Sequence, residues 1–381
     1  MEHGGWADEG YGAVADAFRR NFSERGELGA AVTVFVDGRE VADLWGGIAD
    51  ERTGRPWEKD TAAPIFSAVK GVTTLCALLL DQEGKLDLDA PVARYWPEFA
   101  RHGKERITTR TVLAHRAGLP ALDRTPSLAE ITAWTPVVRA LEEQEPLWEP
   151  GEAIEYHGHT FGFLVGEVIR RITGLTPGAY LRRAVADELG LRTWIGVPEE
   201  EIPRLARVKE PDGGIPLPPA DSLITRILTM NGALVFPGTD DPHGYGSPRV
   251  LAAEFPGAGG ASTARGLATL YAAAATGIDG VVPRLLSRNT LDDIVRELSS
   301  GPSWSGIPDL GTRWGTGFKL DCPSCPMLGP RSFGHDGAGG PMGFGDDEYG
   351  VGFGYVANHM LGSDDDRVDH LVAAVRKCLG A

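Results

Sequence analysis

The strongest constraint on the fold is the order in which strand-like and helix-like segments follow each other. Near the start of the chain, residues 30–36 and 40–48 alternate like strands around the turn at Asp37-Gly38. Residues 350–358 read as another strand close to the end, and helical periodicity dominates the residues between. This order predicts an α/β (α+β) fold in which an antiparallel sheet, split in sequence, is flanked by helices and joined to a mostly helical lobe.

The chain has 381 residues, no internal repeat and no low-complexity linker, so we expect one domain over residues 1–381. We expect the sheet lobe to come from about residues 1–75 and 300–381, and the helical lobe from about residues 76–299. The hydrophobic content of 42% is sufficient for a large core. A cleft between two such lobes is the expected place for a functional site.

Periodicity and capping residues predict the remaining elements. Two further segments near the end are expected in the sheet, residues 314–320 as one strand and residues 331–340 as a glycine-rich strand edge. Residues 196–262 are rich in Pro and Gly, and we expect them to shape the substrate pocket. Helices are expected over residues 12–24, 108–113, 128–143 (with a break at Pro136), 160–173, 176–189, 221–231, 262–275, 289–298 and 367–379.

Ser67 and Lys70 form a Ser-x-x-Lys motif at the start of the apolar run 71–80, which reads as a buried helix. Positions three apart lie on one helix face, so the Lys70 amine can reach the Ser67 hydroxyl. Burial lowers the pKa of a lysine, and a neutral amine can accept the serine proton. The motif predicts a serine hydrolase or acyl-transfer enzyme with an acyl-Ser67 intermediate. The alternative is an ordinary helix start with Ser67 as N-cap and Lys70 exposed.

The charge balance excludes several partners. Lys and Arg number 37 and Asp and Glu number 53, which gives a net charge of −16. An acidic chain without basic clusters argues against binding to nucleic acid or to an anionic membrane surface. Residues 1–8 lack a basic n-region and an apolar h-region, and no apolar stretch approaches the ~20 residues of a membrane span. We therefore expect a cytoplasmic protein; homo-oligomers are compatible with the sequence.

Neither a metal nor an organic cofactor is predicted. The sequence contains no His-Glu-x-x-His, no P-loop and no dinucleotide-binding glycine motif, and the absence of Gly-x-Ser-x-Gly argues against an α/β-hydrolase. Cys322 and Cys325 form a single Cys-x-x-Cys, for which a local disulfide or an ordinary loop is favoured over a zinc site, because no second ligand pair follows. His115 precedes a Gly-Pro turn, and a role in tying down that turn is favoured over a catalytic one.

Several motifs in one order carry a resemblance to a known family. They are Ser67-Ala68-Val69-Lys70, residues 113–120, Pro150-Gly151, Tyr156-His157-Gly158 before residues 166–171, and residues 333–340. In this combination the chain resembles the serine β-lactamase and penicillin-binding-protein superfamily, in its class C β-lactamase-like esterase branch, the family VIII carboxylesterases. The resemblance covers nearly the whole chain.

The resemblance implies catalytic roles. Ser67 is expected to be the nucleophile, with Lys70 holding and activating it. Tyr156 matches the tyrosine of the family's Tyr-x-Asn element and is expected to take the serine proton and return it to the leaving group. The amides of Ser67 and Ala338 are expected to form the oxyanion hole.

The chain departs from the family pattern at two places. Gly158 stands where the family has Asn, and His335 stands where penicillin-recognising members have the Lys of Lys-Thr-Gly. His335 is expected to donate a hydrogen bond to Tyr156 or near the substrate carbonyl, and Gly337 to let the backbone approach the substrate. A largely neutral histidine beside Asp336 is a poor partner for a β-lactam carboxylate. We hypothesise that Asp336 discourages anionic acyl groups.

The expected function is therefore a carboxylesterase acting on small or secondary-metabolite esters. The alternative is a transacylase that passes the acyl group to an alcohol or amine, and a β-lactamase or D,D-peptidase is less favoured. In each case the expected partner is a small-molecule ester or amide. The identity of the substrate does not follow from the sequence.

Overall fold

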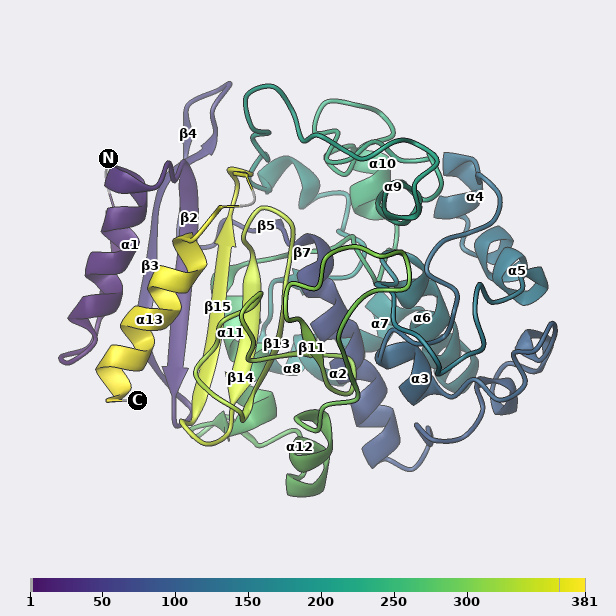
Figure 1. Cartoon of the computed structure of the whole chain (residues 1–381). Coiled ribbons are helices and arrows are strands. Elements are labelled where there is room, and N and C mark those ends of the chain that lie inside the picture. Colours follow the sequence, from purple (N-terminus) through teal and green to yellow (C-terminus); the bar gives the residue numbers. More distant parts are fainter. Residues whose placement is uncertain (1–2, 363, 381) are drawn as a thin grey trace.

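The computed structural model describes residues 3–362 and 364–380 and brings strands from both ends of the chain into one antiparallel sheet (Figure 1). This confirms the expected fold class. Ten strands of the described residues form the sheet, nine of them in the order β1 (His3–Ala7), β3 (Arg39–Asp50), β2 (Gly29–Val36), β15 (Val351–Ala357), β14 (Met342–Asp346), β13 (Ser332–Asp336), β12 (Lys319–Leu320), β11 (Arg313–Trp314) and β10 (Ser299–Ser300), with β4 (Arg55–Pro56) paired to β3.

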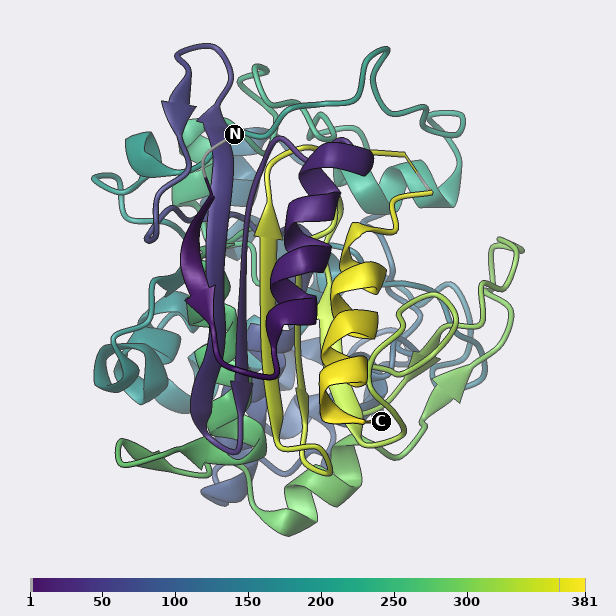
Figure 2. The same ribbon diagram turned by 90° about the vertical axis from the view of Figure 1, so that its left-hand side faces the viewer.

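Helices cover both faces of this sheet. The first and last helices, α1 (Gly12–Glu24) and α13 (Arg367–Leu379), lie side by side on one face (Figure 2). The Ala-rich helix α11 (Ala264–Ala275) covers the other face, where it packs against β15, β14 and β2. Glycines permit this close packing, since a Cβ atom at Gly352 would lie 2.4 Å from the Ala272 nitrogen and one at Gly354 would lie 2.2 Å from the Ala264 oxygen.

The helix α2 (Val69–Gln82) runs through the middle of the main hydrophobic core. It packs against α6 (Thr160–Thr173) and α7 (Pro177–Leu181), and eleven of its fourteen residues are buried. Two of its threonines bond to neighbouring backbone: Thr73 Oγ1 donates to the Pro256 carbonyl at 2.8 Å, and Thr74 Oγ1 donates to the Gly317 carbonyl at 3.0 Å. The apolar run after Lys70 therefore builds a rigid central element.

The remaining elements are short. The helical ones are η2 (Val92–Arg94), η3 (Pro97–Phe99), α3 (Thr109–Leu113), α4 (Leu128–Thr132), α5 (Thr135–Glu143), η4 (Arg182–Ala186), α8 (Asp187–Leu189), η5 (Ile202–Arg204), α9 (Leu223–Thr229), α10 (Pro248–Ala252) and α12 (Arg288–Ile294). The short strands are β5 (Ala63–Pro64), β6 (Thr193–Trp194), β7 (Ala261–Ser262), β8 (Gly277–Ile278) and β9 (Val282–Pro283).

The structure corrects the reading of residues 314–320, which do not form one strand. They form a hairpin in which Trp314 on β11 pairs with Lys319 on β12. The chain reverses here because Gly317 adopts a φ of +78°, a conformation that side chains with a Cβ atom rarely adopt. The hairpin places the side chains of both strands beside β13.

Other differences concern the sheet and its coverage. Four of its strands, β1, β4, β10 and β14, are not predicted by the sequence pattern, and β13 lies inside the sheet between β12 and β14 rather than at an edge. The helix expected over residues 128–143 with a break at Pro136 is divided into α4 and α5, but the division lies at Ala133–Trp134, and Pro136 stands in the first turn of α5. α11 falls within residues 76–299, the range expected for the helical lobe, yet it packs on the sheet.

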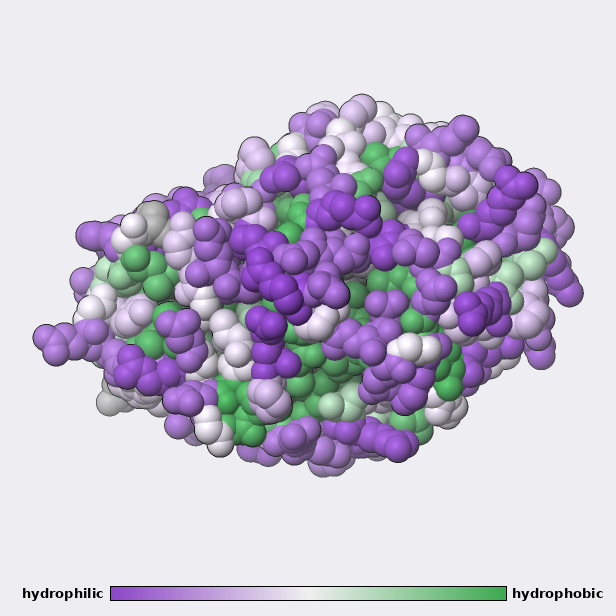
Figure 3. Space-filling view, turned by 90° about the horizontal axis from the view of Figure 1, so that it is seen from below, coloured by the Kyte–Doolittle hydropathy of each residue, from purple (hydrophilic) through white to green (hydrophobic). Residues whose placement is uncertain are grey.

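The net charge of −16 predicts a mainly hydrophilic surface. The face seen from below shows hydrophilic residues around most of the rim and hydrophobic residues gathered in the middle and lower part (Figure 3). Within residues 3–362 and 364–380, no helix combines the length and the apolar character needed to span a bilayer.

Candidate active site

Ser67 lies in the 3-10 turn η1 (Phe66–Ala68), which leads directly into α2. The preceding residue, Phe66, has a φ of +45° although it carries a large side chain. Such a left-handed conformation is strained for a residue other than glycine, and strain of this kind is common beside catalytic groups. The Phe66 ring packs against Phe236 and Tyr245, which hold the turn in place.

Three of the predicted catalytic side chains meet at this turn. Lys70 Nζ lies 3.4 Å from Ser67 Oγ, and Tyr156 Oη donates a hydrogen bond of 2.7 Å to the same oxygen. Lys70 is completely buried, with its amine 4.6 Å from the centre of the Tyr156 ring, and it donates to the Gly257 carbonyl. The alternative of an exposed Lys70 is therefore excluded.

Burial decides the protonation states of these groups. It holds the pKa of Lys70 well below the usual lysine value, and the nearby Lys319 ammonium lowers it further. Burial also raises the pKa of Tyr156, although the hydrogen bond to Ser67 and the charge of Lys319 act in the opposite direction. Burial therefore favours the neutral amine of Lys70 and the neutral phenol of Tyr156, and Lys70 is the group suited to accept the Ser67 proton.

Ser67 opens into a pocket of about 360 Å³. Its polar lining includes Tyr156, Lys319 and Asp336, and segment 337–338 lies against the Ser67 turn. A Cβ atom at Gly337 would lie 2.2 Å from the Ile65 carbonyl oxygen, so only glycine allows this approach. Glu155, Ser303, Asp309, Thr312 and His335 add to the polar lining, and apolar side chains form much of the rest of the wall: Ile154, Ile224, Leu228, Ile307, Pro308, Leu310 and Trp314.

The Ala338 backbone N–H has no hydrogen-bond acceptor within the described part of the chain. Its neighbours differ, since Gly337 N–H donates to the Pro341 carbonyl at 2.7 Å and Gly340 N–H donates to the Gly337 carbonyl at 3.1 Å. An unpaired amide at the edge of a pocket beside the serine is the type of group that can stabilise an oxyanion.

His335 lines the same pocket, but its contacts differ from those expected. Its Nδ1 atom lies 2.6 Å from the Asp336 carbonyl oxygen, and its Nε2 atom has no partner among the described residues. No hydrogen bond joins His335 to Tyr156 in the described residues. Burial lowers the pKa of His335 to about 3, so the ring is neutral at pH 7.

Gly158 and His115 lie beside the site rather than in the pocket. Gly158 is absent from the pocket lining and packs against Ile227, which a Cβ atom would approach to 2.7 Å. His115 is buried, accepts a hydrogen bond of 3.1 Å from the His157 backbone N–H and contacts the rings of Tyr156 and Trp314. Its contacts agree with the role of tying down a turn.

Comparison with known proteins agrees with this geometry. A profile of the Beta-lactamase family matches residues 15–377. The chain belongs to the Beta-lactamase family. This confirms the resemblance drawn from the sequence motifs, and with it the assignment of the chain to the serine hydrolases of the β-lactamase superfamily.

Individual relatives place the chain near the esterases of this family. The chain is 33% identical over 379 residues to the esterase/beta-lactamase LipL of Mycobacterium tuberculosis, covering 94% of this chain and 83% of the relative. It is 32% identical to EstA from Arthrobacter nitroguajacolicus Rue61a, with a TM-score of 0.88 over 100% of this chain and 99% of that one. A crystal structure of a family VIII carboxylesterase matches with 32% identity and a TM-score of 0.87, over 99% of this chain and 100% of that one.

Two side chains of the site, Lys319 and Trp314, are not predicted by the sequence motifs. Lys319 Nζ forms an ion pair of 2.6 Å with Asp336 Oδ1 and lies 5.7 Å from the centre of the Trp314 ring. The Trp314 ring stacks on Tyr156, with 5.9 Å between centroids. Only recognition of the Gly315–Phe318 turn would have brought the two residues together. Asp336 is thus paired with a cation, which weakens the expectation that it repels anionic substrates.

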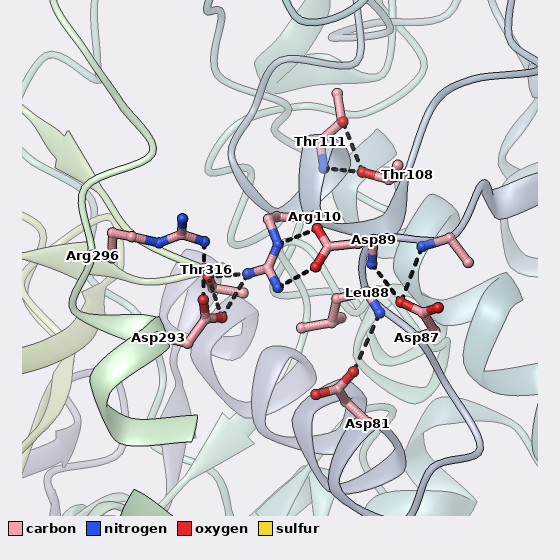
Figure 4. Close-up of polar contacts among 11 residues, drawn as sticks. Asp81, Asp87, Leu88, Asp89, Thr108, Arg110, Thr111, Asp293, Arg296 and Thr316 are labelled. Atoms are coloured by element: carbon pink, nitrogen blue, oxygen red, sulfur yellow. Dashed lines mark hydrogen bonds and ion pairs between the residues drawn. The ribbon is translucent and has the colours of Figure 1, made fainter. Parts of the chain in front are cut away.

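The β11–β12 turn is held by an ion-pair cluster around Arg110 on α3 (Figure 4). Arg110 lies between the Asp89 carboxylate, at 2.7 Å, and the Asp293 carboxylate of α12, at 2.6 Å. Its Nη1 atom also donates to Thr316 Oγ1 at 3.0 Å, and this hydroxyl donates to Asp293 at 3.2 Å. Because Thr74 of α2 bonds to Gly317 in the same turn, the hairpin is fastened to the helix that carries Lys70.

Replacing Thr316 with Val is expected to loosen this turn without removing the Arg110–Asp293 ion pair. The buried hydroxyl makes two hydrogen bonds, so the free energy of unfolding should fall by about 1–3 kcal/mol. Because the turn carries Trp314 and Lys319 on its two sides, kcat/KM should fall by about tenfold. Urea unfolding and ester kinetics measure the two effects.

Thr173→Val, at the end of α6, is the matched control, because that hydroxyl bonds only to nearby backbone. It should lower stability and leave the kinetics unchanged. The same kcat/KM for Thr316→Val and Thr173→Val would show that the β11–β12 turn does not position the side chains of the site.

The Cys-x-x-Cys pair is an ordinary turn in this structure. Cys322 and Cys325 are free thiols that face each other in an isolated antiparallel bridge. Across residues 3–362 and 364–380, no group of three or more His, Cys, Asp or Glu side chains is arranged to hold a metal ion.

Proposed function

We propose that this chain is a carboxylesterase that hydrolyses small, uncharged esters through an acyl-Ser67 intermediate. The observation that carries the proposal is the position of Ser67 Oγ, which lies between a completely buried lysine amine and a tyrosine hydroxyl at the base of an open pocket. The relatives named above as esterases support the same activity. The profile match over residues 15–377 supports one domain over the whole chain.

In the proposed acylation step, Ser67 Oγ attacks the ester carbonyl carbon while its proton passes to the neutral Lys70 amine. The carbonyl oxygen becomes an anion that accepts hydrogen bonds from the Ser67 and Ala338 backbone amides, each contributing ~3 kcal/mol. The bond to the leaving alcohol then breaks, the Tyr156 phenol gives its proton to that oxygen, and the proton on Lys70 restores the phenol. The products are an acyl-Ser67 ester and a free alcohol.

In deacylation, water takes the place of the alcohol and the same groups act in reverse. Water gives a proton to the base, attacks the acyl carbon, and Ser67 Oγ leaves with a returned proton. The released product is a carboxylic acid. An alcohol or amine that enters instead of water would give a new ester or amide.

The pocket favours uncharged substrates. Its wall is largely aliphatic and aromatic, and its one cation, among the residues described, is paired with Asp336. A free substrate carboxylate would have to compete with Asp336 for Lys319 and would lose its hydration without a second cation. Neutral acyl chains of short to medium length fit this lining.

The test compares p-nitrophenyl butyrate, a carboxylated β-lactam and an N-acyl-D-Ala-D-Ala peptide as substrates, with the intact mass of the protein followed during turnover. Ester turnover with an added butyryl mass, and slow or no turnover of the two anionic substrates, would support the proposal. Faster β-lactam or peptide turnover would contradict it. Accelerated loss of the adduct with an added alcohol or amine, giving a new ester or amide, would identify a transacylase.

Replacing Tyr156 with Phe is expected to lower kcat/KM for the butyrate ester by about 10²–10⁴-fold. The Phe ring keeps the stacking on Trp314 but removes the hydroxyl that bonds to Ser67. Tyr180→Phe is the matched control, because the Tyr180 hydroxyl on α7 is buried and has no hydrogen-bond partner in the described residues. A loss as small as in the control would remove Tyr156 from the proton-transfer path.

A further inference from the structure

The Lys319–Asp336 ion pair is the feature of the site that the motifs did not indicate. The two side chains come from neighbouring strands, with Lys319 on β12 opposite Gly334 of β13 and Asp336 two residues further along β13. Both line the pocket together with Ser67 and Tyr156. The side chain of Lys319 is 14% exposed and that of Asp336 is 36% exposed, so the pair faces the pocket while most of the lysine is buried.

We propose that Lys319 and Asp336 are positioning residues that set the charge state of Lys70: the ammonium of Lys319 favours the neutral amine, and Asp336 limits this effect. The inference rests on the function proposed above. It assigns a role to a pair that no motif of the sequence brings together.

The surroundings of Lys70 leave these two as the charges that act on it. The other titratable groups around it are held neutral by burial, which lowers the pKa of His157 to about 4 and those of His159 and His335 to about 3. The pKa of His115 is also lowered and that of Tyr156 raised. The remaining acids of the pocket are Glu155, which bonds to the Ser305 and Tyr156 amides, and Asp309.

The aromatic rings between the two lysines connect them in space. Lys319 Nζ lies 5.7 Å from the centre of the Trp314 ring, this ring stacks on Tyr156, and the Lys70 amine lies 4.6 Å from the centre of the Tyr156 ring. The charges of Lys319 and Asp336 therefore lie near Lys70, in keeping with the directions in which they shift its pKa.

The ion pair explains how a second lysine is tolerated beside the first. Burial alone would lower the pKa of Lys319, but the carboxylate of Asp336 raises it above the usual lysine value, so Lys319 stays charged. The same contact lowers the pKa of Asp336, although burial acts against it. Lys70 has no carboxylate within hydrogen-bond distance among the described residues; its contacts are Ser67 and a carbonyl. One lysine is thus held as a cation and the other as a base.

Two single variants give opposite expected results. Lys319→Met removes the cation, so Lys70 holds its proton more tightly. The rising limb of the pH profile for covalent labelling of Ser67 therefore moves to higher pH. Asp336→Asn removes the anion, so Lys70 loses its proton more easily and the limb moves to lower pH. Each shift should be roughly half a pH unit or more. A change that only disturbed the fold would not produce shifts of opposite sign.

The measurement is the pH dependence of the rate at which a fluorophosphonate probe labels Ser67. In this reaction an O–P bond forms, fluoride leaves, and the serine proton passes to the base, so the probe reports Ser67 activation without an ester substrate. The double variant Lys319→Met/Asp336→Asn should return the limb close to its wild-type position, because the net charge is restored. Lys319→Arg keeps the charge and should keep the profile.

Limbs that move in the same direction in the two single variants, or that do not move, would overturn the inference. Shifts of opposite sign would support it even if p-nitrophenyl butyrate is not turned over, in which case only the proposed esterase function fails. A changed KM for an anionic ester with an unmoved labelling profile would show that Lys319 binds substrate instead, which also overturns the inference. A wild type whose Ser67 is never labelled would overturn both proposals.

Discussion

Ser67→Ala is expected to lower kcat for p-nitrophenyl butyrate by at least about 10⁴-fold and to abolish the butyryl adduct in the intact mass. The hydroxyl oxygen is the point at which Lys70 and Tyr156 converge, and no group that remains in the variant can form the acyl-enzyme. The fold should survive, because the change removes only the hydrogen bond from Tyr156 and the longer one from Lys70, each with a net contribution of about 1 kcal/mol. Mass spectrometry and steady-state kinetics on one preparation measure both effects.

Ser23→Ala controls for handling and purity, because Ser23 is exposed on α1 and bonds only to the Arg20 carbonyl. Its kcat and its butyryl adduct should match those of the wild type. Turnover by Ser67→Ala within a hundredfold of this control, or an adduct that persists on it, would place the nucleophile elsewhere.

Lys70→Met is expected to lose about 10³-fold or more in kcat/KM and at the same time to gain stability. The activity falls because the proton acceptor for Ser67 is gone. The stability rises because burial depresses the pKa of Lys70 in the folded protein. Between that depressed pKa and the usual value near 10.5, the unfolded chain binds a proton that the folded chain does not. Folding therefore costs free energy in this window, the cost shrinks as the pH rises, and Met removes it.

Thermal unfolding from pH 6 to pH 9 measures the second effect. The Tm advantage of Lys70→Met should be largest at low pH and should decrease as the pH rises. Lys85→Met is the matched control, since Lys85 is exposed just after α2 and pairs only with Glu83. A destabilised Lys70→Met with ordinary activity would show that Lys70 is a structural lysine.

Predictability from the sequence differed among the parts of the site. Ser67 and Lys70 could be paired from local spacing, because a helix brings positions three apart onto one face and an apolar run indicated burial. Tyr156 lies in an irregular segment, so no periodicity connects it to Ser67, 89 residues away, and only the resemblance pointed to it. Neither local spacing nor the family resemblance predicts Lys319 as a site residue. Its position depends on a turn at Gly317, which has a positive φ, within a stretch that reads as one strand.

The fold followed a similar division. Long helices with clear apolar faces, such as α1 and α13, were predicted within one or two residues. The pattern does not predict the strands β1 and β14, because four of their ten residues are glycine, which has no side chain to mark an alternating pattern. Gly343 is required by the close approach of Tyr271 on α11, a long-range contact that local sequence does not reveal.

The fastening of the β11–β12 turn has a consequence for how this enzyme can diversify. Bonds from α2, α3 and the end of α12 fix the hairpin that carries Trp314 and Lys319. The pocket wall just before it, residues 301–312, is joined to the neighbouring segment at Trp304 and Ser305, where backbone amides bond to Ile154 and Glu155. Insertions or substitutions between residues 306 and 311 can therefore change which substrates bind while the proton-transfer groups keep their positions. New substrate specificities can thus arise from sequence changes in this loop alone.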